Sequence, residues 1–171
     1  MRWIMASISL IVVLTLPAFA QTAPAAKGKL SEQDRSFVDQ ATTGGLAEVA
    51  AGKIAEQKAQ KDNVKDFARQ MIADHGKAND QLMAIVGQEK LKAPTAPDKR
   101  HAAAADRLKK MSGAEFDRSY MQGQIEDHEK TVQLFQKEAK SGQDAKLKAF
   151  AAETLPTLQH HLQMAQSIGA K

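Results

Sequence analysis

The sequence predicts an all-α protein, a ferritin-like four-helix bundle in which a long connection between the second and third helices carries a short extra helix. Hydrophobic residues recur at steps of three and four along four long segments, which is the spacing of one helix face. Aromatic residues make up only 5% of the chain and alanine is abundant, so small side chains allow helices to pack closely. Turn-forming residues separate the four segments.

Residues 1–20 are typical of a secretory signal peptide. Arg2 supplies a positive charge, residues 4–16 are almost all apolar, and Ala-Phe-Ala at 18–20 fits a cleavage site, so we expect cleavage after Ala20. The apolar run is shorter than the roughly 20 residues of a membrane-spanning helix, although an uncleaved anchor is the alternative. We therefore expect a periplasmic or secreted protein with no membrane span after signal cleavage. The chain has no cysteine, which excludes disulfides.

A flexible leader is expected over residues 21–30, which are mostly small and polar. The bundle domain is expected over residues 31–169. Ser31 is a typical N-cap for a first helix over residues 32–59, and Asp34 stands three residues later as its partner in a capping box.

The second helix is expected over residues 62–89, with Asp62 as its N-cap. Two prolines in residues 91–98 end this pattern, and a short helix follows over residues 99–110. Because the whole connection covers residues 90–113, it favours a crossover of the ferritin-like kind over a simple up-and-down bundle.

The third helix is expected over residues 113–140 and the fourth over residues 144–168, with a Ser-Gly turn at 141–142 between them. Pro156 lies inside the fourth helix. Its missing N–H is expected to kink that helix or to leave a backbone carbonyl free.

Each long helix carries one distinctive polar residue in the middle of its apolar face: Glu48, His75, His128 and His161. At a rise of about 1.5 Å per residue, these positions come to one level when the helices pack side by side. A buried polar group needs a partner, and four such groups at one level suggest a metal ion. Gly44 and Gly52, one turn either side of Glu48, are expected to let a neighbouring helix approach closely.

Three imidazoles and one carboxylate are ligand types for a transition metal, and the sequence leaves zinc, copper, iron and manganese open. Asp74 and Asp127 directly precede two of the histidines. They are expected to orient ligands as hydrogen-bond acceptors or to ligate the metal themselves. The alternative is a metal-free polar layer, in which the buried side chains bond to one another and fix the helix register.

Five motifs along the chain carry a resemblance to a known family. They are Gly44-Gly45-Leu46-Ala47-Glu48, Phe67-Ala68 through Asp74-His75, Phe116-Asp117-Arg118-Ser119-Tyr120-Met121, Asp127-His128-Glu129-Lys130, and Leu155-Pro156 through His161-Leu162. With these motifs, the chain resembles the bacterial exported family catalogued as domain of unknown function 4142, which is grouped with ferritin-like folds. The likeness spans residues 36–169. No activity is established for the family, so the resemblance implies a fold rather than a function.

The sequence lacks the motifs of several enzyme classes. Di-iron ferritin-like enzymes use Glu-x-x-His pairs, but Ile72, Ile125 and Leu158 stand three residues before the histidines. The chain also has no cysteine nucleophile, no evident Ser-His-Asp arrangement and no glycine-rich phosphate loop. The sequence therefore favours a non-enzymatic protein, although a small metalloenzyme acting on peroxide or oxygen stays open if a coordination position is free.

The net charge of +4 is slight and lies on mixed helix faces, which disfavours a nucleic acid as partner. Two hypotheses for function remain. The first is an exported bundle that binds a metal ion for storage, buffering or stress protection. The second is a metal-free helical module for envelope stress or protein interaction. A homo-oligomer is compatible with both.

Overall fold

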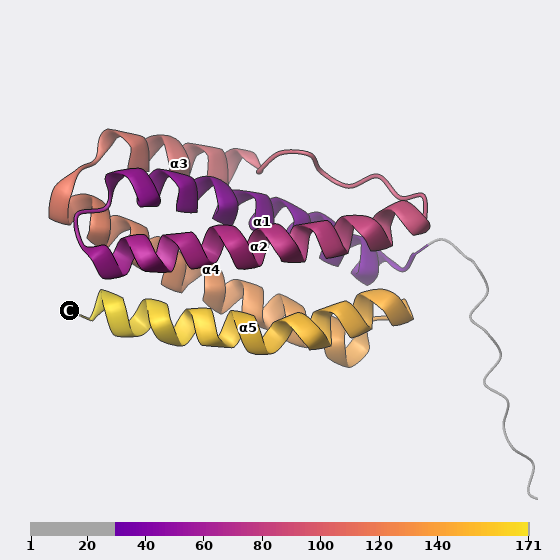
Figure 1. Ribbon diagram of the computed structural model, residues 1–171. Helices are drawn as coiled ribbons and strands as arrows, with labels where there is room; N and C mark the ends of the chain where they lie inside the picture. Colours follow the sequence, from indigo (N-terminus) through magenta and orange to yellow (C-terminus); the bar gives the residue numbers. More distant parts are fainter. Residues whose placement is uncertain (1–29, 171) are drawn as a thin grey trace, which may run out of the picture.

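The structure, a computed structural model, describes residues 30–170, which form five α-helices and contain no strand. Four long helices make the bundle, and the short α3 lies on its outside (Figure 1). In chain order the helices are α1 (Glu32–Lys58), α2 (Asp62–Gln88), α3 (Lys99–Lys110), α4 (Gly113–Ser141) and α5 (Ala145–Gly169). The predicted helical bundle with a short helix in the crossover is confirmed. The predicted signal peptide, and the leader apart from Leu30, lie outside the described residues, and the domain boundaries stay a prediction.

The four long helices form two antiparallel pairs, α1 with α2 and α4 with α5. After α2, the connection runs back along the molecule, so that α4 begins at the same end as α2 (Figure 1). The pairs then pack α1 against α4 and α2 against α5, while α3 rests mainly on α1. Every long helix therefore lies antiparallel to the two long helices that it packs against, while α3 runs in the same direction as α1. Membership of the ferritin-like group remains a prediction.

The helix ends are fixed by both local and distant side chains. The capping box at the start of α1 is confirmed, because Ser31 Oγ accepts from Asp34 N at 3.1 Å and Asp34 accepts from Ser31 N at 3.3 Å. Asp62 is not the N-cap of α2 as predicted: that position is Lys61, which makes no side-chain cap bond. Instead, Asp117 of α4 accepts from the backbone N–H groups of Gln60 and Lys61 at 2.9 and 3.0 Å. A residue far along the chain supplies the cap.

Pro156 lies inside α5, which continues as helix on both sides of it. Proline cannot donate to the carbonyl one turn earlier, so one helical hydrogen bond is missing at this point. The surrounding packing of α5 on α4 and α2 maintains the helix in spite of that loss.

Close helix contact near Glu48 occurs at Gly45 and Gly52. A Cβ on Gly52 would lie 2.9 Å from Ile72 Cγ1 and 3.1 Å from the backbone oxygen of Ala68, and one on Gly45 would overlap the Asn79 side chain. The expectation for Gly52 is met, but nothing lies within 4 Å of a Cβ on Gly44. The predicted close approach was therefore assigned to the wrong one of two adjacent glycines.

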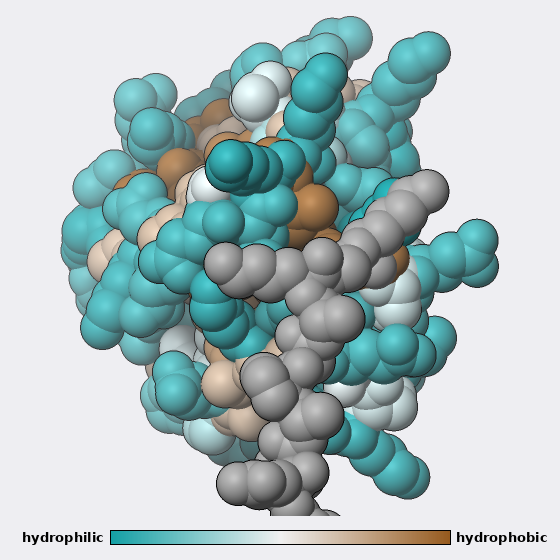
Figure 2. Space-filling model, turned by 90° about the vertical axis from the view of Figure 1, so that its right-hand side faces the viewer, coloured by the Kyte–Doolittle hydropathy of each residue, from teal (hydrophilic) through white to brown (hydrophobic). Residues whose placement is uncertain are grey.

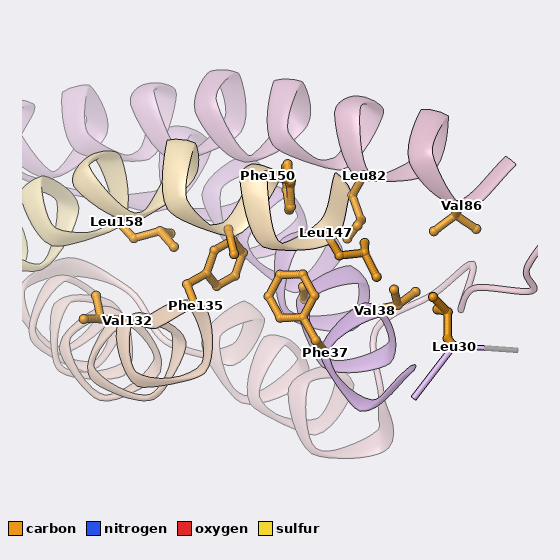
Figure 3. Close-up of a cluster of buried hydrophobic side chains, with 12 residues drawn as sticks. Leu30, Phe37, Val38, Leu82, Val86, Val132, Phe135, Leu147, Phe150 and Leu158 are labelled. Carbon is orange, nitrogen blue, oxygen red and sulfur yellow. The ribbon is translucent and has the colours of Figure 1, made fainter. Parts of the chain in front are cut away.

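The hydrophobic core is divided into two clusters. The first cluster (Figure 3) consists of Leu30, Phe37, Val38, Ala41, Leu82, Val86, Val132, Phe135, Leu147, Phe150, Ala151 and Leu158. The second consists of Ala55, Ala59, Val64, Phe67, Ala68, Met71, Phe116, Tyr120, Met121 and Ala165. Along each long helix, the residues of one cluster are followed by a buried polar residue and then by the residues of the other. A polar layer therefore separates the two halves of the core.

The outer surface is mainly hydrophilic. Figure 2 views the end of the bundle where α1 begins and shows charged and polar side chains with a few hydrophobic ones between them. Among the described residues, Met83 is the large hydrophobic side chain that is exposed, at 40%. None of the helices in residues 30–170 combines the length and hydropathy that a membrane span requires.

A buried carboxyl pair joins the start of α1 to the end of α4. Glu138 is 1% exposed and accepts from Gln33 Nε2 at 3.1 Å, and its carboxyl interacts electrostatically with that of Asp34. Burial, together with the neighbouring Asp34, raises the pKa of Glu138 to about 7. Burial alone would raise the pKa of Asp34 as well, but hydrogen bonds from the Gln143 backbone and Ser31 lower it. Of the two carboxyls, Glu138 is therefore the one whose protonated form the fold favours.

We predict that Glu138 makes the stability of the fold depend on pH. Its folded pKa of about 7 lies above the ordinary 4.5, so its stabilising contribution is complete below about pH 4.5 and is lost as the pH rises through about 7. Glu138→Gln keeps an uncharged group here. The free energy of unfolding of the wild type, relative to this variant, should fall by about 1–2 kcal/mol between about pH 5 and pH 8. Parallel profiles from chemical denaturation would contradict the assignment.

Candidate metal centre

Three imidazoles meet in the polar layer between the two clusters. His75 comes from α2, His128 from α4 and His161 from α5, and they are 7%, 1% and 1% exposed. The ring centroids are 5.4 Å apart in all three pairs, so the rings form an equilateral triangle. Each histidine occupies a place on its helix where the apolar periodicity would otherwise put a core residue.

The tautomer of His128 is fixed by its own helix. Its Nδ1 lies 2.9 Å from the backbone carbonyl oxygen of Gln124. Because a carbonyl can only accept, Nδ1 carries the proton and Nε2 carries a lone pair. That Nε2 lies 3.3 Å from Nε2 of His75. The unprotonated side of the His128 ring therefore faces the centre of the triangle.

His161 is held by a carboxylate from another helix. Its Nε2 lies 2.9 Å from Asp74 Oδ2 and donates to it, which leaves the lone pair on Nδ1. This Nδ1 is buried and has no hydrogen-bond partner among the described residues. A buried nitrogen acceptor without a donor is costly, and its position beside two other imidazoles suggests a bound cation.

One ligand nitrogen from each of the three histidines lies within 4.8 Å of the others. Histidines that bind metals usually donate their second N–H to a carboxylate or a backbone carbonyl, which fixes the ring orientation. His161 has such a bond to Asp74, and His128 has one to the Gln124 carbonyl. The donor set of three nitrogens therefore fits a transition-metal ion.

The protein environment keeps the imidazoles neutral. Burial lowers the pKa of His75 well below the ordinary 6.5, and the two neighbouring imidazoles lower it further. Burial also lowers the pKa values of His128 and His161, although hydrogen bonds to Gln124 and Asp74 act in the opposite direction. Neutral imidazole is the form of histidine that can coordinate a metal ion.

Glu48 lies beside the triangle rather than in it. Its Oε1 is 3.8 Å from Nδ1 of His128, the nitrogen that faces the Gln124 carbonyl. Its Oε2 accepts from Gln124 Nε2 at 2.6 Å. Burial raises the pKa of Glu48 to about 7, and burial with the nearby Glu48 raises that of Tyr120 well above 10. The structure therefore pairs Glu48 with Gln124, on the opposite side of the His128 ring from His75.

The two aspartates that precede histidines have different surroundings. Asp74 bonds to His161, a ring on another helix, as a carboxylate that orients a ligand would. Asp127 instead pairs with Arg100 at 3.1 Å and with Lys130 at 3.9 Å, and its charge acts to raise the pKa of His128. Whether any of the predicted residues binds a metal stays a prediction.

Gln124 is a site residue that the sequence reasoning missed. It lies one turn before His128 and is 3% exposed, so helical spacing was a signal that could have found it. Its side chain holds Glu48 and its carbonyl holds His128. Glutamine was overlooked because it is not a preferred metal ligand.

The fold and the site together define a four-helix bundle protein whose core contains three buried imidazoles. The chain belongs to the family described as Domain of unknown function (DUF4142), whose model matches residues 19–168. The resemblance seen in the sequence is thereby confirmed at the level of this family, whereas the bacterial exported origin remains a prediction. No curated protein matches the chain.

Solved structures with the same fold share little sequence with this chain. A DUF305 fragment from Deinococcus radiodurans aligns with a TM-score of 0.72 and 14% identity, covering 84% of this chain and 100% of that one. A DUF305 protein from Streptomyces coelicolor aligns with a TM-score of 0.69 and 12% identity, covering 80% and 89%. The protein CopM in its Cu(I)-bound form aligns with a TM-score of 0.66 and 17% identity, covering 78% and 93%. At these identities the likeness concerns the fold alone.

We predict that the metal-free protein loses stability in acid through its imidazoles. The folded pKa of His75 lies well below 6.5, so the unfolded chain takes up a proton first and the free energy of unfolding falls as the pH drops below about 6.5. His75→Gln should flatten this slope between about pH 7.5 and pH 5. His160→Gln, which changes an exposed neighbour of the site, should leave the slope as it is. Equal slopes in all three proteins, measured by urea denaturation, would contradict the prediction.

Proposed function

We propose that this protein binds one transition-metal ion between His75, His128 and His161. The unpartnered, buried Nδ1 of His161 carries this proposal, because a metal-free layer of hydrogen bonds would have supplied it with a donor. A metal ion would satisfy that lone pair together with those of the other two rings. It would also compensate for bringing three polar rings into the core.

The donor set favours some ions over others. Imidazole nitrogen suits zinc, copper, iron and nickel, whereas manganese prefers oxygen ligands. Zinc and copper are therefore the first ions to test, with iron next. The Cu(I)-bound form of CopM, a structural neighbour at 17% identity, is a reason to include Cu⁺ beside Cu²⁺.

The burial of the site supports retention of an ion rather than turnover. All three imidazoles are at least 93% buried, since the most exposed of them is His75 at 7%. A site closed in this way has the character of a storage, buffering or stress-protection site, whereas catalysis needs a coordination position that a substrate can reach. With the signal peptide expected over residues 1–20, we place this role in the periplasm or outside the cell.

The direct test is the metal content of the mature protein, exported and purified without chelator, beside the variants His128→Ala and His160→Ala. The proposal expects about one ion per chain in the wild type and in His160→Ala, and loss of it in His128→Ala. If the wild type holds no ion and does not take up Zn²⁺, Cu⁺, Cu²⁺ or Fe²⁺, the proposal is wrong. The polar layer would then be structural, as in the metal-free interaction module.

We predict that the two aspartates differ in their effect on metal affinity. Asp74→Ala removes the acceptor of His161 Nε2–H and should weaken binding about 10- to 100-fold, which is usual for such partners of metal ligands. Asp127→Ala is the matched control and should change the dissociation constant by less than about threefold, because Asp127 pairs with exposed Arg100 and Lys130. Competition with a chromophoric chelator measures both. Equal losses would contradict the assigned role of Asp74.

A further inference from the structure

A cleft of about 670 Å³ lies between α1, α3 and α4. Alanines of α1 and α3, among them Ala51 and Ala105, line its walls together with both basic and acidic side chains of α3 and α4, and Glu48, Tyr120 and Gln124 also line it. None of the residues of α3 is fully buried. The short helix therefore covers the cleft without filling it.

Two buried polar atoms of the residues that line this cleft have no partner. Gln124 Oε1 and Tyr120 Oη are without a hydrogen bond among the described residues, although these side chains are only 3% and 1% exposed. Glu48 orients the Gln124 amide, because Glu48 Oε2 accepts a hydrogen bond from Gln124 Nε2 at 2.6 Å. This leaves Gln124 Oε1 without a donor. Buried oxygens without donors are rare and costly in folded proteins. Together with the Glu48 carboxylate, these oxygens are potential ligands for a cation among the residues that line the cleft.

Glu48 also connects the cleft to the imidazoles. It lines a second, smaller hollow of about 30 Å³, which His75 and Asn79 line as well. Of the residues around the two cavities, Glu48 is the one that they share. The smaller hollow has room for about one or two water molecules, so a hydrated ion would have to shed most of its water at Glu48 before passing further.

The cover over the cleft is weakly held. The ion pair between Arg100 of α3 and Asp127 of α4 is 3.1 Å long, and its arginine is 58% exposed. Such a pair contributes little to stability. With no fully buried side chain, α3 has the features of a segment that separates locally from the bundle at low cost in free energy.

We infer that the cleft beneath α3 is the path by which a divalent transition-metal ion reaches the three imidazoles, with Glu48, Gln124 and Tyr120 as a transient oxygen site. This inference rests on the proposed metal binding and adds the class of ion and its path. Carboxylate, amide and phenol oxygens attract a divalent ion more than the soft Cu⁺. The ion then passes from the Glu48 carboxylate to the nitrogens of His75, His128 and His161, which bind it at equilibrium.

The test measures the rate at which the protein takes up Zn²⁺ separately from its affinity for Zn²⁺. Stopped-flow mixing of the metal-free protein with Zn²⁺ and a fluorescent zinc indicator gives the loading rate, and equilibrium competition gives the dissociation constant. At pH 8, above the pKa of about 7 of Glu48, Glu48→Gln should slow loading at least about tenfold, as expected for loss of an attracting charge in a cleft. Release should slow in parallel, so that the dissociation constant changes less than about threefold. Glu129→Gln, an exposed carboxylate outside the cleft, should slow loading less than about twofold.

A second pair of variants leaves the buried network untouched. Ala105→Trp puts a large side chain into the cleft, whereas Ala103→Trp puts the same side chain on the exposed side of α3, outside the cleft. The first should slow loading and the second should not. This pair keeps the inference testable if Glu48→Gln folds poorly.

Each remaining outcome overturns a defined part of the account. Unchanged loading in both Glu48→Gln and Ala105→Trp would exclude this path while the proposed metal binding stands. A fall in affinity for Glu48→Gln as large as that for His128→Ala would make Glu48 a resident ligand instead. Binding of Cu⁺ but not Zn²⁺ would contradict an oxygen-lined path and leave the imidazole site in place. If neither ion binds, the path and the proposed function fail together.

Discussion

The constraint on which the structure depends is the removal of three imidazoles from water at one level of the core. Each unsatisfied polar atom in such a place costs about 1–3 kcal/mol. Hydrogen bonds to the Gln124 carbonyl and to Asp74 satisfy one nitrogen each of His128 and His161. They also turn the remaining lone pairs inward, where His161 Nδ1 has no partner among the described residues. The same bonds that reduce the cost of burial therefore also fix the orientation of the His128 and His161 rings.

The rest of the bundle follows from this layer. Hydrophobic clusters on both sides of it exclude water, so the imidazoles stay neutral, and the antiparallel packing of α2 against α5 brings Asp74 to His161. The remaining long helix, α1, contributes Glu48 on the other side of the His128 ring. The crossover then places α3 over that side and encloses the cleft. One half of the layer thus contains the three imidazoles, and the other half contains Glu48 and Gln124 and borders the cleft.

The sequence was sufficient for what depends on local periodicity. The helices lie within a residue or two of their expected bounds, because apolar spacing, Ser31 and the Ser-Gly turn are local signals. All four polar residues in mid-helix, including Glu48, are buried as their positions on the apolar faces indicated. The rotation of each helix about its own axis could not be predicted from the sequence. An ideal helix departs from a strict seven-residue repeat by about 20° per heptad, so the spacing of apolar residues does not fix which way each side chain points. Periodicity therefore did not show that Glu48 would bond to Gln124, that Asp74 would meet His161, or that Asp117 would cap α2.

The most direct test of the central claim is the position of the ion itself. Crystals of the zinc-loaded protein, measured on both sides of the zinc absorption edge, would give an anomalous difference map that locates every bound zinc. The account predicts one strong peak in the core, about 2.0–2.1 Å from one nitrogen each of His75, His128 and His161. A map with peaks only at surface carboxylates, or with a core peak held by Glu48 and Gln124 and out of reach of the imidazoles, would contradict it.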